Sequence, residues 1–215
     1  VVALDPSYGG FDLAIVVVTV NNLTFDIPGS VPSIAFYATG TANTITLTGA
    51  SHSYIFGSPG NDKLTGNTGI NHIHGGGGND TISGGAGDDL IMVDGGSGEI
   101  DGGSGWDTLR SNDLGTNDFF GIETLDASEG VLRTTPWQLN RFFQLKDSLG
   151  PADSRIDLKL WDGGTTNDSL GFGLHSVRLI DDGLTSGINF TASQNGDYLT
   201  GSGFADYLKG MGGND

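Results

Sequence analysis

Acidic side chains recur at nine-residue intervals in the middle of this chain. The sixth position of successive nine-residue phrases, counted from Gly57, is occupied by Asp62, Asn71, Asp80, Asp89, Gly98 and Asp107. The same interval separates Asp197, Asp206 and Asp215 further along the sequence. A short carboxylate suits a tight turn, and a hard cation requires several carboxylate and carbonyl oxygens. The spacing therefore predicts bound divalent cations rather than a merely polar surface.

The charge balance agrees with this interpretation. The 215 residues carry 26 acidic and 9 basic side chains, for a net charge of −17, and only Glu99, Glu123 and Glu129 of the acids are glutamates. Such an acidic chain should repel nucleic acid and anionic membranes, so we expect neither as a partner. The sequence has no cysteine, which excludes disulfides and zinc–thiolate sites. Its longest apolar run, LAIVVVTV, is too short to span a bilayer, so we expect no membrane span.

Glycine and aliphatic residues fill other fixed positions of the phrase. Glycine occupies the fourth position of six consecutive phrases, and isoleucine or leucine occupies the eighth. These aliphatic residues are Leu64, Ile73, Ile82, Ile91, Ile100 and Leu109. Nine residues suit a six-residue turn with glycines at positive φ, followed by a three-residue strand with one inward aliphatic side chain. Two phrases then complete one coil of a right-handed parallel β-roll.

The phrases GGGGNDTIS, GGAGDDLIM and GGSGWDTLR resemble the calcium-binding nonapeptide of RTX proteins, the haemolysin-type repeat. That family includes secreted bacterial toxins, proteases, lipases, adhesins and surface-layer proteins. The resemblance covers residues 57–110 and, as the start of a second array, residues 192–215. It implies a roll that binds several Ca²⁺ ions, in a parent protein that is secreted or held at the bacterial cell surface.

In that family each Ca²⁺ lies between one turn and the turn two phrases further on. The resemblance therefore implies the ligand pairs Asp62 with Asp80, Asn71 with Asp89, Asp89 with Asp107, and Asp197 with Asp215, with Asp206 as a further metal ligand. Asn71 offers only a neutral oxygen, so its site should be weaker. Two departures from the pattern weaken the sites nearby: Gly98 faces Asp80, and Phe204 replaces the fourth-position glycine in GSGFADYLK.

The charge of the array should oppose its own folding. Residues 57–109 hold eight acidic side chains and one basic one, Lys63, for a net charge of −7. One small apolar residue per phrase cannot offset that repulsion together with the ordering entropy. Calcium would remove the repulsion and add its binding free energy to folding. We therefore expect an array that is disordered in the calcium-poor cytosol and folds outside the cell, following the type I secretion that the resemblance implies.

The sequence predicts a mainly all-β fold that is divided into four segments. Residues 1–48 form a β-rich N-terminal cap, 49–110 the calcium-binding β-roll, 111–182 a β-rich spacer, and 183–215 the truncated start of a second array. Within the spacer, TTPWQLNRFFQL predicts a helix near 135–145, with Thr135 as N-cap and Pro136 at the first helical position. The final phrase, GMGGND, stops within a repeat, so we expect further RTX repeats in the parent chain.

Motifs of catalysis are missing from the sequence. It contains neither HExxH nor GxSxG, and Glu123 and Glu129 have no partner histidine at a recognisable spacing. We therefore expect no enzyme in this segment, and the activity of the parent protein stays open. The favoured function is a calcium-binding module of a larger secreted bacterial protein. The alternative is a structural or adhesive surface protein, such as a surface-layer protein or large adhesin, whose copies self-associate through the repeats.

Overall fold

The computed structural model describes residues 2–4, 13–18, 23–27, 33–127, 131–142, 144–146, 155–160, 164–165, 176–181, 184, 186–192 and 196–214. The chain divides into two compact units. Unit 1 comprises Val1–Leu109 with Thr116–Ile122, and unit 2 comprises Arg110–Gly115 with Glu123–Asp215. The finer division at residues 48, 110 and 182 remains a prediction.

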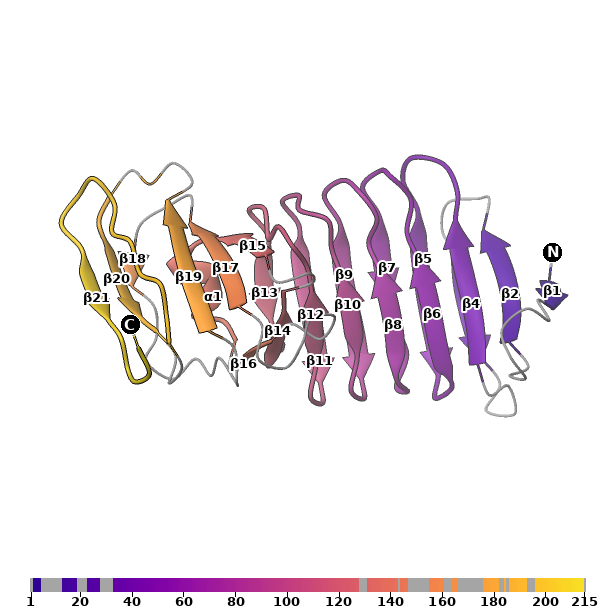
Figure 1. Ribbon diagram of the computed structural model, residues 1–215. Helices are drawn as coiled ribbons and strands as arrows, with labels where there is room; N and C mark the ends of the chain where they lie inside the picture. Colours follow the sequence, from indigo (N-terminus) through magenta and orange to yellow (C-terminus); the bar gives the residue numbers. More distant parts are fainter. Residues whose placement is uncertain are drawn as a thin grey trace. The chain divides into compact units, whose positions relative to one another are not determined.

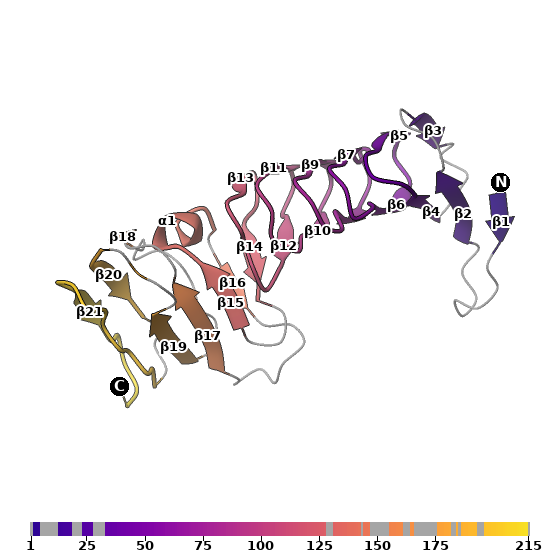
Figure 2. The ribbon, with the colours of Figure 1, turned by 90° about the horizontal axis from the view of Figure 1, so that it is seen from above.

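The described residues of unit 1 form two β-sheets that face each other along the length of the unit (Figures 1 and 2). The first contains β2 (Leu13–Val18), β4 (Ser33–Ala38), β6 (His52–Phe56), β8 (Asn71–His74), β10 (Leu90–Met92) and β12 (Thr108–Arg110), and β1 (Val2–Leu4) pairs antiparallel with β2. The second contains β3 (Leu23–Ile27), β5 (Thr44–Gly49), β7 (Lys63–Thr65), β9 (Thr81–Ala86), β11 (Glu99–Ser104) and β13 (Asp118–Phe120). From β2 onward, consecutive strands alternate between the sheets, so two strands and two turns form one coil. The predicted parallel β-roll is confirmed.

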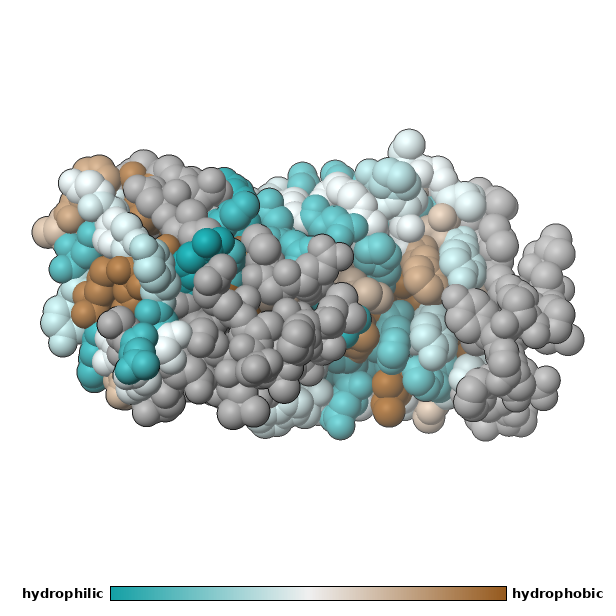
Figure 3. All heavy atoms as spheres, in the orientation of Figure 1, coloured by the Kyte–Doolittle hydropathy of each residue, from teal (hydrophilic) through white to brown (hydrophobic). Residues whose placement is uncertain are grey.

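Aliphatic residues of successive coils stack directly on one another inside unit 1. In the first sheet Ile73 pairs with Ile55 on one side and with Ile91 on the other. The second sheet repeats this arrangement with Leu64, Ile82 and Ile100. Each of these six side chains is no more than 1% exposed. On the face that Figure 3 shows, the described surface of this unit is mainly hydrophilic or neutral (teal and white), with small hydrophobic spots in brown.

The strands before the repeats continue the same two sheets. β4 pairs parallel with β6, and β5 pairs parallel with β7. Strands β2, β4 and β5 lie in the segments LAIVVVTV, SIAFYATG and NTITLTG, which are rich in β-forming residues. Ile45 lies opposite Leu64 although nineteen residues separate them. The extra residue is accommodated between Ile45 and Ile55, so the stack of aliphatic side chains continues without interruption.

The described residues of unit 2 form short parallel strands and one short helix. β14 (Thr124–Asp126) pairs with β16 (Gln144–Lys146). A three-stranded sheet contains β15 (Val131–Thr134), β17 (Arg155–Leu160) and β19 (Ser176–Asp181), and another contains β18 (Gly164–Thr165), β20 (Ile188–Thr191) and β21 (Tyr207–Lys209). Each of the segments GIETLDAS, RIDLKLWD and SVRLIDD thus contains one of these strands.

The helix α1 (Pro136–Leu139) is shorter than predicted. Its start is as expected, because Thr135 Oγ1 accepts the backbone N–H of Gln138 at 3.2 Å and Gln138 Oε1 accepts that of Thr135 at 3.1 Å. The helix ends after one turn, since Gln144–Lys146 pair in a sheet instead. No helix among the described residues is long and apolar enough to cross a membrane.

Candidate metal sites

The sixth-position residues of the repeats lie at the end of each turn and point into the roll. Each stands two residues before an inward aliphatic residue, and alternate residues of an extended chain face the same side. Five of these side chains are therefore buried, although four of them are carboxylates. The exposed fractions are 3% for Asp62, 0% for Asn71, 5% for Asp80, 2% for Asp89 and 0% for Asp107.

A hydrogen-bond ladder joins these residues from one coil to the next. The backbone N–H of Asp62 donates to Asp80 Oδ1 at 2.9 Å, that of Asn71 to Asp89 Oδ1 at 2.7 Å, and that of Asp89 to Asp107 Oδ1 at 2.8 Å. The structure thus brings together the three pairs of the first array that the resemblance implies. In each pair, one side-chain oxygen is bound to the backbone of the neighbouring coil.

The other carboxylate oxygen faces the first glycine of its own phrase. A Cβ atom on Gly84 would lie 2.3 Å from Asp89 Oδ2 and 2.4 Å from the carbonyl oxygen of Gly102. A Cβ atom on Gly75 would lie 2.5 Å from Asp80 Oδ2. Only glycine leaves room at these positions. Oxygen atoms of two successive coils therefore converge on the α-carbon of Gly84.

Asp89 Oδ2 is buried and accepts no hydrogen bond. A buried carboxylate oxygen without a donor is costly unless a cation neutralises it. A carboxylate with backbone carbonyls beside it is the oxygen-only donor set that Ca²⁺ prefers, so the residues of these turns fit calcium. Within the described ranges, no three His, Cys, Asp or Glu side chains gather into one metal site. Backbone carbonyl oxygens would therefore have to complete the coordination of an ion here.

Burial raises the pKa of two carboxyl groups in this ladder. The pKa of Asp89 rises from 3.8 to about 7, mainly because burial disfavours the charged form; hydrogen bonds from Asn71 oppose the rise and the charge of Asp107 adds to it. The pKa of Asp80 rises to about 6, again mainly through burial and against the backbone hydrogen bond from Asp62. The metal-free roll therefore disfavours ionisation of both groups. A bound cation acts in the opposite direction, since it attracts the ionised carboxylate.

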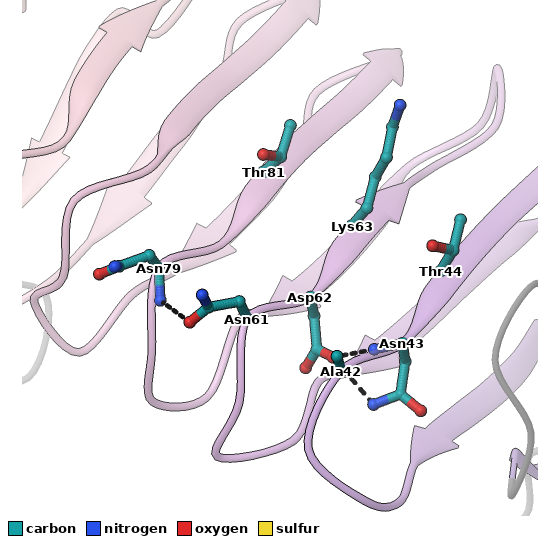
Figure 4. Close-up of a pocket in the computed structure, with 8 residues that line it drawn as sticks. All are labelled: Ala42, Asn43, Thr44, Asn61, Asp62, Lys63, Asn79 and Thr81. Carbon is teal, nitrogen blue, oxygen red and sulfur yellow. Dashed lines mark hydrogen bonds between the residues drawn. The ribbon is translucent and has the colours of Figure 1, made fainter.

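A second ladder, which the sequence interpretation missed, runs in the opposite direction along the exposed fifth position. Asn61 Oδ1 accepts the backbone N–H of Asn79 at 2.9 Å (Figure 4), and Asn79 Oδ1 accepts that of Ser97 at 3.0 Å. On the other edge of the roll, Asp88 Oδ1 accepts the backbone N–H of Trp106 at 2.8 Å. The repetition of asparagine at an eighteen-residue interval was the available signal. Asp88 thus lies outside the buried ladder.

Two asparagines that were not predicted extend the buried ladder. Gly98 has no side chain at the sixth position, yet its backbone N–H donates to Asn117 Oδ1 in the next coil. At the other end, Asp62 Oδ1 accepts the backbone N–H of Asn43 at 2.6 Å. Each asparagine lies 19 residues from its partner, and counting in nines does not find them.

The second array, in unit 2, is described only in part. Asp197 is buried, and Asp206 Oδ1 accepts the backbone N–H of Ile188 at 2.9 Å. This bond and those from Ser202 lower the pKa of Asp206. Phe204, at the glycine position of its phrase, is exposed. Asp215, the predicted partner of Asp197, lies outside the described residues.

Parallel strands, glycine turns and buried aspartates spaced one coil apart define a class of protein, the β-rolls that hold cations in their turns. The family model of the RTX calcium-binding nonapeptide repeat matches residues 56–91, 65–99 and 191–215. The chain therefore carries RTX repeats and is a calcium-binding module of the RTX type. Comparisons with curated proteins and with solved structures gave no match.

Proposed function

We propose that this chain is a calcium-dependent folding module of a larger secreted bacterial protein. In this proposal the parent protein leaves the cell unfolded by type I secretion, and the roll folds in the calcium-rich medium outside. The observation that carries the proposal is Asp89 Oδ2, a buried carboxylate oxygen with no hydrogen-bond donor, beside the carbonyl oxygen of Gly102. The ligands in the first array are Asn71, Asp80, Asp89 and Asp107, and Asp197 with Asp215 form the corresponding pair in the second.

The buried carboxylates make folding of the roll costly when no cation is bound. Without a cation, ionised Asp80 and Asp89 oppose folding at neutral pH, because burial raises the pKa of both groups. A ligand that binds only the folded state stabilises it by about 2.7 kcal/mol per site at one hundred times its dissociation constant. Several occupied sites therefore exceed the cost of the buried charges. A calcium-poor compartment lacks this contribution, so the chain stays unfolded there.

A calcium titration of the whole chain, followed by far-UV circular dichroism and light scattering, tests the proposal. We expect a cooperative gain of β-signal between chelator and 10 mM calcium, about the upper limit of affinity for extracellular modules, without growth of particle size. A gain accompanied by growing particles would instead support the surface-layer or adhesin function, in which copies self-associate. No response to calcium would refute both.

Two matched variants test the ladder within the same titration. Asp89→Ala removes a buried sixth-position carboxylate, whereas Asp88→Ala removes an exposed one whose Oδ1 binds only the backbone of Trp106. Asp89→Ala, and likewise Asp80→Ala, should raise the calcium midpoint far more than Asp88→Ala. Equal shifts in all three would show that the buried carboxylates have no special role in calcium binding.

A further inference from the structure

The Asp62 carboxylate differs from the others because protein donors surround it. Its Oδ1 accepts the backbone N–H of Asn43 at 2.6 Å and the Asn43 side-chain amide at 2.8 Å (Figure 4). Its Oδ2 accepts the backbone N–H of Ser58 at 2.6 Å and the Ser58 hydroxyl at 3.0 Å. Asn43, Ser58 and Asp62 are all at most 3% exposed. Both oxygens of this buried carboxylate are thus satisfied without an ion.

The position of Ser58 explains this difference. Ser58 is the second residue of its phrase, where the phrases of Asp80 and Asp89 have Gly76 and Gly85. Gly85 has a φ of 109° and no side chain, and Asp89 Oδ2 accepts no hydrogen bond. In the Ser58 phrase, the backbone N–H and the hydroxyl instead converge on Asp62 Oδ2. Serine at the second position thus adds donors to Asp62 that glycine does not provide to Asp89.

Unit 2 contains an independent example of the same arrangement. Ser202 is the second residue of the phrase GSGFADYLK, and it stands four residues before Asp206. Its backbone N–H donates to Asp206 Oδ2 at 2.6 Å, and its hydroxyl donates to Oδ1 at 2.8 Å. Ile188 provides the donor from the neighbouring coil, at 2.9 Å. In both turns with a serine at this position, protein donors thus bind both oxygens of the aspartate carboxylate.

We infer that Ser58 and Ser202 make their own turns independent of calcium, so that Asp62 and Asp206 are held by hydrogen bonds and bind no ion. N–H and O–H groups present positive hydrogen atoms to the carboxylate, which occupies its lone pairs and repels a cation. The inference rests on the proposed function, since it divides the repeats into turns that bind calcium and turns that do not. It also replaces the prediction that Asp62 and Asp206 are metal ligands.

The Asn43 amide supports this assignment at the edge of the array. Its Nδ2 group donates both to Asp62 Oδ1 and to Ser58 Oγ, at 2.8 and 3.0 Å. These two partners determine the orientation of the amide, because its oxygen would repel the carboxylate if the two ends were exchanged. The first turn of the matched array is therefore closed by hydrogen bonds from the preceding coil.

Counting bound ions tests the inference. Isothermal titration calorimetry of the whole chain with Ca²⁺ gives the number of sites in wild type, Asp62→Asn and Asp89→Asn, and circular dichroism at saturating calcium confirms that each is folded. Asp62→Asn should bind as many ions as wild type, whereas Asp89→Asn should bind at least one fewer. Loss of an ion in Asp62→Asn would overturn the inference. A wild type that binds no calcium would instead refute the proposed function.

A gain-of-site variant decides the question if Asp62→Asn does not fold. The double variant Asn43→Asp with Ser58→Gly places a glycine at the second position, as in the Asp80 and Asp89 phrases, and a carboxylate in the preceding coil. It should bind one more calcium ion than wild type. An unchanged or smaller number of ions in the folded double variant would show that the serine and asparagine do not determine metal binding at Asp62.

Discussion

Replacing Asp89 by asparagine should change the stability of the roll in opposite directions with and without calcium. Without calcium, the rise in the pKa of Asp89 from 3.8 to about 7 corresponds to about 4 kcal/mol of cost for the ionised carboxylate above neutral pH. Asparagine removes that charge and keeps an oxygen for the backbone N–H of Asn71, which Asp89 Oδ1 accepts at 2.7 Å. The metal-free variant should therefore be more stable than wild type, by up to about 4 kcal/mol.

The neighbouring coil shows that asparagine fits at the sixth position. Asn71 is fully buried there, and its Nδ2 group donates to the carbonyl oxygens of Gly69 at 2.6 Å and Gly84 at 3.2 Å. With calcium present the sign reverses, because the variant loses a charged ligand and a site worth about 2.7 kcal/mol at one hundred times the dissociation constant. Calcium should thus add less stability to the variant than to wild type, because the metal-free variant is more stable and the calcium-bound variant is less stable.

Urea unfolding at pH 8, followed by circular dichroism in chelator and in 10 mM calcium, measures both effects. If wild type is unfolded in chelator, the gain should appear as recovered β-signal in the variant. Asp88→Asn is the control, since Asp88 is exposed and its amide analogue keeps the oxygen that binds Trp106. A variant destabilised equally in chelator and in calcium would refute the reasoning, because the ionised carboxylate would then carry no cost that calcium relieves.

Three further predictions concern protonation, packing and turn geometry. In chelator, stability should rise as the pH falls from 8 to 5, because the folded pKa values of Asp80 and Asp89 exceed the unfolded ones; their contribution is complete below about 4 and is lost as the pH rises through about 6 and 7. Thermal melts across this pH range check it, and saturating calcium should reverse the trend, since binding displaces protons. Ile82→Ala should cost about 2–5 kcal/mol in calcium, measured by urea unfolding, with exposed Thr81→Ala as its control. Gly84→Ala should abolish the calcium-induced dichroism, because its Cβ would lie 2.3 Å from Asp89 Oδ2, whereas Gly77→Ala, with its nearest neighbour at 3.7 Å, should be tolerated.

The nine-residue spacing predicted the roll because it determines the direction of each side chain. Once Ile73 and Ile82 are placed inward, the residue two positions before each must also point inward, which buries Asn71 and Asp80. The same spacing places residues eighteen apart on adjacent coils, as in the pairing of Leu64 with Ile82. Strand positions and the buried acid column thus follow from local pattern alone.

Other features depended on contacts that the pattern does not contain. Asn43 and Asn117 join the ladder at an interval of 19 residues, because the turns at those points hold one additional residue. The hydrogen bonds of Ser58 depend on the shape of its turn. The sequence pattern does not distinguish a serine that binds the neighbouring carboxylate from one that merely replaces a glycine. The helix after Thr135 ended early because its following residues pair with β14, a contact between segments far apart in the sequence.

The two ladders connect the Asp89 turn of unit 1 to both of its neighbouring coils. The Asp89 carboxylate accepts the backbone N–H of Asn71 in one adjacent coil, and the Asp107 carboxylate accepts that of Asp89. Asp88 in the same turn binds the backbone of Trp106 in the coil on the other side. Disorder in the Asp89 turn would therefore remove buried hydrogen bonds from two coils at once, each worth about 0.5–1.5 kcal/mol. Since nearest-neighbour terms of this kind govern solenoid stability, calcium bound at one turn stabilises the turns beside it. The roll should accordingly fold over a narrow range of calcium concentration, although its sites differ in ligand charge.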